Sequence, residues 1–196
     1  MSRYDAAVAR FDAVHREDPR AVDVAGSAVP VSIRYHQRMA AWLDELDPDA
    51  SEALRLAVRC QHLRRWAVPR QDYPAGGAGY KRWRVALALR HADEAEVMLR
   101  DVGYGDDVVE RVRALLLKKG LRHDPEVQLL EDVACLVFLE TELAAFAPRH
   151  DDAKLVDILR KTWGKMSPRG HAAAMALAAR LPPDLAALVG RAIREA

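Results

Sequence analysis

The segment 128–140 holds the acidic residues that are best placed to do chemistry. It is apolar on nearly all sides, which predicts a central, buried helix with Glu131 and Asp132 in its middle. At helical spacing, Gln128 and Cys135 share a face with Asp132. A buried carboxylate is costly unless it is paired or binds a metal. Two interpretations follow: a salt bridge to one of the many arginines, or metal ligation and acid–base catalysis by Glu131 and Asp132.

Two histidines on other predicted helices could join these carboxylates. His62 lies near the end of the third predicted helix and His91 in the middle of the fourth, both among apolar residues. A lone histidine there is more often a hydrogen-bonded core residue, but neutral imidazole with carboxylate suits Fe, Mn or Zn. We therefore predict a divalent metal site formed by His62, His91 and Asp132. The other histidines have exposed-looking or terminal contexts, and only one, His36, is well placed to join a site: His15, His36, His123, His150 and His171.

Arginine and aromatic residues gather between residues 64 and 84. Arginine binds phosphate or carboxylate bidentately, and aromatic rings can stack on a base or a guanidinium group. The alternative is that Trp66 and Trp83 belong to the core and that the arginines pair with acidic residues. Residues 52–90 contain nine Lys or Arg and two Asp or Glu, whereas 91–152 contain seven and fifteen. We predict that an anionic substrate binds to these residues: Arg65, Arg70, Tyr73, Arg82 and Arg84.

Lys161 and Lys165 lie one helical turn apart and could also contact a phosphate. They belong to the run Lys161-Thr-Trp-Gly-Lys-Met-Ser167, whose Lys-Met-Ser resembles a loop of class I aminoacyl-tRNA synthetases. Three residues are too few to indicate tRNA charging, and no alternation of strands and helices predicts a nucleotide-binding sheet.

Apolar residues recur at steps of three and four, and strand-like alternation is absent, which predicts an all-α protein. The predicted helices are 3–17, 31–46, 51–66, 79–101, 105–119, 124–146, 151–165, 168–180 and 183–195. Two prolines and two glycines make residues 67–78 a loop. Nothing in the chain indicates a linker, so we expect one compact helical bundle over residues 1–196.

Composition narrows the class of protein. The net charge of +1 gives no global field for nucleic acid or membranes, so a nucleic-acid partner is not expected. No apolar run approaches the roughly 20 residues that cross a bilayer, and the N-terminus lacks an apolar signal segment. Cys60 and Cys135 lie in apolar helical patterns and are interpreted as reduced core thiols. We therefore expect a cytoplasmic protein.

Several runs resemble an uncharacterised family of bacteria and fungi, domain of unknown function 4202. The runs are Cys60-Gln-His-Leu-Arg-Arg-Trp66, Pro69-Arg70, Tyr73-Pro74, Gly79-Tyr-Lys-Arg-Trp-Arg84, His91-Ala92, residues 128–140 and residues 161–167. A more distant resemblance is to the HD superfamily of metal-dependent phosphohydrolases, which are all-helical and bind metals through His and Asp. This sequence has Gln61-His62 where that superfamily has His-Asp, and His36 is the candidate for its first histidine.

The HD resemblance implies a metal-dependent hydrolase that acts on an anionic small molecule, a phosphate ester or nucleotide. The alternative is a metal-free module that binds an anionic metabolite or regulates another protein, with the histidines and Asp132 as a hydrogen-bonded core network.

Overall fold

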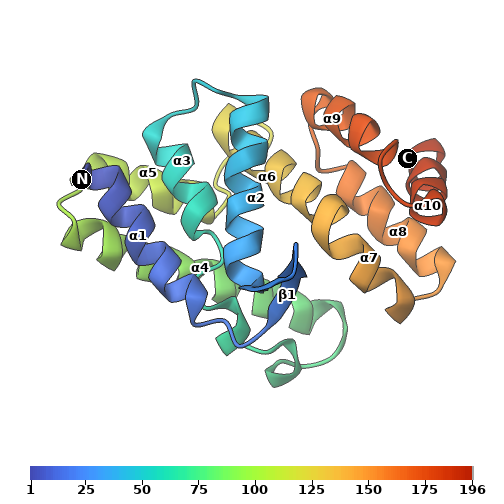
Figure 1. Cartoon of the computed structure of the whole chain (residues 1–196), viewed down its shortest axis with the longest axis horizontal. Coiled ribbons are helices and arrows are strands. Elements are labelled where there is room, and N and C mark those ends of the chain that lie inside the picture. Colours follow the sequence, from blue (N-terminus) through green and yellow to red (C-terminus); the bar gives the residue numbers. More distant parts are fainter. Residues whose placement is uncertain (196) are drawn as a thin grey trace. The chain divides into compact units, whose positions relative to one another are not determined.

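The structure, a computed structural model, describes residues 1–195 and is predominantly α-helical, which confirms the predicted fold class (Figure 1). Its α-helices are α1 (Arg3–Arg16), α2 (Val31–Leu46), α3 (Glu52–Cys60), α4 (Gly76–Asp101), α5 (Asp106–Leu116), α6 (Pro125–Val137), α7 (Leu143–Phe146), α8 (Asp152–Trp163), α9 (Pro168–Ala178) and α10 (Pro183–Arg194). The predicted helix 124–146 is divided into α6, a π-helical segment at Phe138–Glu142, and α7.

Polar side chains fix the starts of many helices, because they accept hydrogen bonds from N–H groups that have no partner inside the helix. The side-chain caps are Ser2 for α1, Ser51 for α3, Asp124 for α6, Asp151 for α8 and Ser167 for α9. Proline occupies an early helical position in α6, α9 and α10, where a missing N–H costs nothing.

A β-hairpin follows α1, although no strand was predicted. Strands β1 (Ala21–Val24) and β2 (Ser27–Pro30) pair antiparallel, with Val22 opposite Val29. Each strand has only four residues and most are exposed, so there is no buried face to produce an alternating pattern. Ala25 and Gly26 both have positive φ, as a tight hairpin turn requires.

The third predicted helix ends earlier than expected. The prediction was 51–66, but α3 ends at Cys60, so His62 lies in the turn that follows and not on a helix. Arg64 has left-handed backbone dihedral angles (φ 45°), which a continuing α-helix does not allow. Short 3₁₀ turns then follow at Arg65–Ala67, which begins inside the predicted helix, and at Arg70–Asp72, within the predicted loop.

Contacts divide the chain into two compact units, each with its own core. The first comprises residues 1–41 and 49–120, in which α3 packs on α1 and α5, and α4 packs on α5 and α1. Its fully buried side chains include Phe11, Leu54 and Leu99. The prediction of one domain over 1–196 stays a prediction.

The second unit comprises residues 42–48 and the chain from residue 121 onward. Helix α6 packs on α9, and α8 lies beside α10 (Figure 1). Trp42 is buried and donates from Nε1 to Glu140 Oε2 at 3.0 Å. Cys60 and Cys135, one in each unit, are buried and are not joined by a disulfide. None of the helices in the described part of the chain has the length and apolar character that spanning a membrane requires.

Candidate functional site

The predicted site residues are divided between the two units. The first unit contains His62, His91 and the basic–aromatic residues that were predicted to bind substrate. Glu131, Asp132, Lys161 and Lys165 belong to the second unit.

In the first unit, four histidine rings follow one another through the interior. His15 on α1 stacks on His36 of α2 with ring centroids 3.7 Å apart. The His36 ring lies 6.3 Å from that of His62, and the His62 ring lies 5.7 Å from that of His91 on α4. The centroid of the Tyr35 ring lies 5.1 Å from the ring centroids of both His36 and His62. The structure thus brings the two predicted histidines together.

Sequence reasoning missed the burial of two members of this row. The contexts of His15 and His36 suggested exposure, but their exposed fractions are 0% and 1%, so that expectation was wrong. The available signal for His15 was its place four residues after Phe11 and eight after Ala7, both in the core. The expectation that His36 could join a site stays a prediction, and His15, which was not singled out, stacks on it.

Backbone carbonyls fix the tautomers of His15 and His36. His15 Nε2 donates to the carbonyl oxygen of Arg59 at 2.9 Å, and His36 Nδ1 donates to that of Ser32 at 2.7 Å. Because a neutral imidazole has one N–H, each ring keeps a lone pair on its other nitrogen. Those nitrogens are buried without a hydrogen-bond partner among the described residues, and the buried ring of His91 lies near the backbone of Leu63.

Burial keeps these rings uncharged. It lowers the pKa of His15, and it lowers the pKa of His36 and His62 well below the ordinary value. Burial, together with the nearby Arg65, lowers the pKa of His91 to about 3. The charged groups that act most strongly on His62 and His91 include two guanidinium groups, Arg65 and Arg84. The surroundings of the two rings are therefore electropositive.

The two guanidinium groups differ in how they are held. Arg65 lies over the ring of Trp83, with its Cζ atom 4.7 Å from the ring centroid. Trp83 is itself buried and donates from Nε1 to the carbonyl oxygen of Val68 at 2.9 Å. Arg84 is half-buried and makes no hydrogen bond or ion pair with any residue in the range 1–195. An unpaired, half-buried guanidinium beside neutral imidazoles is suited to an anion.

The remaining residues of the predicted substrate set have different roles. Arg70 donates to the carbonyl oxygens of Tyr73, Pro74 and Gly76 at 2.9, 2.9 and 3.2 Å, so its guanidinium group holds its own loop together. Arg82 is exposed and lies on α4 two residues before Arg84. Two residues correspond to about 200° around a helix, so the two arginines point in nearly opposite directions.

In the second unit, hydrogen bonds satisfy the buried carboxylate of Asp132. Ser167 donates to it from its backbone N–H at 2.8 Å and also from its hydroxyl group, and Gln128 Nε2 donates at 3.1 Å. The sequence predicted that Gln128 and Asp132 share a face, and they do. The predicted alternatives were an arginine salt bridge or chemistry, whereas the partners found are a hydroxyl, an amide and a backbone N–H.

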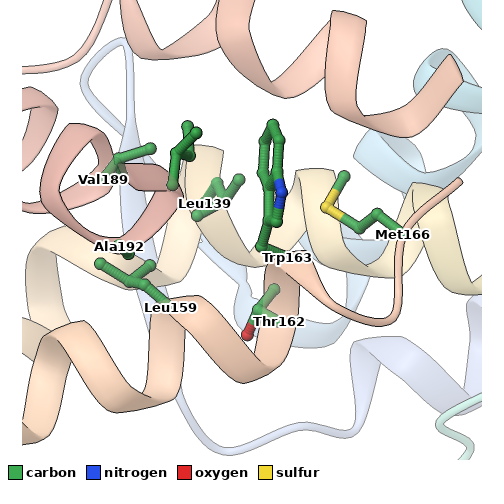
Figure 2. A pocket seen from close by; sticks show the side chains of 8 residues that line it. Leu139, Leu159, Thr162, Trp163, Met166, Val189 and Ala192 are labelled. Carbon is green, nitrogen blue, oxygen red and sulfur yellow. The ribbon is translucent and has the colours of Figure 1, made fainter. Parts of the chain in front are cut away.

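Glu131 and Lys165 lie near this network, and the carbonyl oxygen of Lys165 accepts from Gln128 Nε2 at 2.8 Å. Glu131 is buried, and its Oε1 lies 3.7 Å from Lys165 Nζ. Lys161 is exposed and pairs with Asp157 at 2.7 Å. A shallow apolar pocket of the same unit (Figure 2) is lined by Leu139, Leu159, Thr162, Trp163, Met166, Val189, Ala192 and Ile193. It contains no charged side chain and none of the predicted site residues.

The predicted metal site has limited support in side-chain geometry. Among residues 1–195, no three side chains of His, Cys, Asp or Glu lie in an arrangement that could hold a metal ion. His62 and His91 offer a pair of neutral imidazoles within one unit. The metal roles of His62, His91 and Asp132, and the catalytic roles of Glu131 and Asp132, stay predictions.

Comparison with known proteins identifies the family and leaves the activity open. No curated protein matches the chain, and no solved structure matches it. The resemblance to the HD superfamily therefore stays a prediction. The family model described as "Domain of unknown function (DUF4202)" matches residues 5–189, nearly the whole length. The chain belongs to this family of domains of unknown function, DUF4202.

Proposed function

We propose that the first unit binds an anionic group of a small molecule, a phosphate or a carboxylate, between His62, His91, Arg65 and Arg84. The observation that carries this proposal is the electropositive setting of the buried His91 ring, which lies near Arg65 and near an Arg84 that has no hydrogen-bond or ion-pair partner within the described chain. A neutral imidazole supplies one N–H donor, and the guanidinium groups supply charge and further donors. An anion would accept hydrogen bonds from the imidazole N–H and from the guanidinium groups, and it would balance the positive charge of the guanidinium groups.

Titration calorimetry of the whole protein with inorganic phosphate, nucleoside monophosphates and dicarboxylates tests this proposal. We expect at least one of these anions to bind and Arg84→Gln to weaken it about tenfold or more, about 1.4 kcal/mol. Arg82→Gln is the matched control, because that arginine is exposed on another face of the same helix. Equal weakening by both substitutions, or no binding of any anion, would contradict the proposal.

A second candidate function is metal-dependent hydrolysis of a phosphate ester, for which the 5.7 Å spacing of the His62 and His91 rings is the supporting observation. Neutral imidazoles keep a lone pair for a transition metal. A divalent Fe, Mn or Zn ion held by His62 and His91 would supply Lewis-acid activation of water. Metal analysis of purified protein, repeated on His91→Ala, decides: an unchanged content of these metals would remove this candidate.

A further inference from the structure

The first half of α4 presents an unusual surface. Lys81 and Arg82 are exposed, and Val85 and Leu89 are 60% and 46% exposed. Together with Ala86 these residues line a shallow depression along the helix, here called the α4 surface. From Tyr73 to Ala92 the chain contains no Asp or Glu. The α4 surface is therefore both basic and apolar.

The second half of the same helix differs from the first, because its carboxylates form ion pairs within the molecule. Asp93 and Glu96 pair with Arg113, each at 2.8 Å. Glu94 pairs with Arg90 at 3.1 Å, and Asp101 pairs with Arg10 at 2.8 Å. Lys81 and Arg82 have no such partner among residues 1–195. The unmatched charge of α4 is thus positive and confined to its first half.

The residues of the α4 surface have the spacing of a face on which a second helix can pack. Arg82, Val85 and Leu89 follow at steps of three and four, so they lie along one side of the helix, with Ala86 beside them. An exposed valine also has lower helix propensity than alanine or leucine, so Val85 does not favour the helix itself. A polyanion could neutralise Lys81 and Arg82 but would leave Val85 and Leu89 in water.

We propose that the α4 surface docks an acidic amphipathic helix of a partner protein. The partner's apolar stripe covers Val85, Ala86 and Leu89, and its flanking carboxylates pair with Lys81 and Arg82. Charge complementarity favours an acidic partner, because Lys81 and Arg82 are positive. Val85 and Leu89 provide two large apolar side chains against which another helix can pack. Insertion into a membrane interface uses a broader apolar face, commonly with Trp or Phe. A second copy that presented the same surface would be repelled by its like charge.

Fluorescence anisotropy with the full-length protein and a synthetic helical peptide tests the inference. The peptide has about 18 residues, about five turns, with leucines along one face and glutamates beside them. We expect it to bind, and Val85→Asp to weaken binding about tenfold or more. Val97→Asp is the matched control, since Val97 lies on the same helix with the same exposed fraction of 60%. Lys81→Glu combined with Arg82→Glu should weaken binding to a similar extent.

Three results would overturn the inference. One is equal binding of a scrambled peptide of the same composition, which would reduce the interaction to charge alone. Another is an equal effect of Val85→Asp and Val97→Asp. The third is failure of the peptide to bind while vesicles with anionic lipid or single-stranded RNA bind with the same dependence on Lys81 and Arg82. None of these measurements depends on whether an anion binds at His91.

Discussion

The hydroxyl group of Ser167 takes part in two hydrogen bonds at once. The oxygen accepts from the N–H of Gly170 at 3.2 Å, which caps α9, and the hydroxyl proton goes to the buried carboxylate of Asp132. Losing a serine cap costs about 1 kcal/mol, and a hydrogen bond to a charged group contributes about 1.5–3 kcal/mol. The lysine–methionine–serine run therefore has a structural explanation within this fold.

Ser167→Ala is expected to lower the free energy of unfolding by about 2–4 kcal/mol, because it removes a cap and a donor to a buried charge. Ser51→Ala is the matched control, since Ser51 is exposed and only caps α3, through the N–H of Leu54 at 3.2 Å. It should cost about 1 kcal/mol. Urea denaturation of both variants measures the difference, and equal losses would show that the bond to Asp132 contributes nothing.

Gly170 lies where Asp132 approaches α9 most closely. A Cβ atom at this position would be 2.7 Å from the carboxyl carbon of Asp132, closer than such atoms pack. Glycine to alanine normally favours a helix by about 1 kcal/mol. Here we expect Gly170→Ala to destabilise the protein by about 1–3 kcal/mol, because the carboxylate must move from its donors.

The comparison for Gly170→Ala is Gly77→Ala in the first turn of α4. A Cβ atom at Gly77 would meet nothing within 4 Å, and this substitution should be neutral or stabilising. Thermal unfolding of the two variants is sufficient to compare them. Stabilisation by both would mean that Asp132 can shift without cost.

At the scale of the element, the turn of the hairpin holds an alanine in a left-handed conformation. Ala25 has a φ of 52°, a conformation that costs an alanine of the order of 1 kcal/mol or more. Asn-Gly is the preferred pair for a two-residue turn in which both φ angles are positive. We expect Ala25→Asn to stabilise the hairpin by about 0.5–1 kcal/mol, seen as slower amide hydrogen exchange in β1 and β2. Ala21→Asn, within β1, should not slow this exchange.

Helices could be predicted from this sequence because each carries its own signals. The apolar period, Asp124-Pro125 and Ser51 mark elements whose cause is local. The end of α3 was predicted too late, because residues 61–66 continue a helical pattern while Arg64 adopts a left-handed conformation. That conformation accompanies tertiary contacts, since Arg64 pairs with Glu17 at 3.2 Å and with Glu94 at 3.5 Å.

The candidate site could be predicted only in part, because contacts between residues distant in sequence also position its side chains. The pairing of His62 with His91 followed from two apolar helical patterns, and the structure places the rings 5.7 Å apart. The partners of Asp132 could not be predicted, because Ser167 is 35 residues away in sequence. Sequence alone also could not show that Arg70 is bound to the carbonyl oxygens of its own loop while Arg84 has no described partner.

At the scale of the whole molecule, four imidazoles make stability depend on pH: those of His15, His36 and His91, which are buried, and that of His62, which is half-buried. Their pKa values are lowered in the folded state, so below the ordinary value of about 6.5 the unfolded chain binds protons that the folded chain does not. Stability contributed by each ring is fully present above that pH. It is lost as pH falls towards the folded-state pKa, by up to about 1.4 kcal/mol per pH unit for each proton.

His91 allows this dependence to be tested one proton at a time, because its pKa of about 3 leaves it neutral throughout the range from pH 6 to pH 4. We expect the free energy of unfolding of His91→Gln, from urea titrations across that range, to fall less steeply than that of the unsubstituted protein, by about one proton, or about 1.4 kcal/mol per pH unit. The slope is the decisive quantity, because the substitution can change stability at every pH. His123→Gln, at an exposed position, should leave the slope unchanged. An unaltered slope in His91→Gln would mean that a proton reaches His91 in the folded protein, and that its ring is more accessible than its 2% exposure implies.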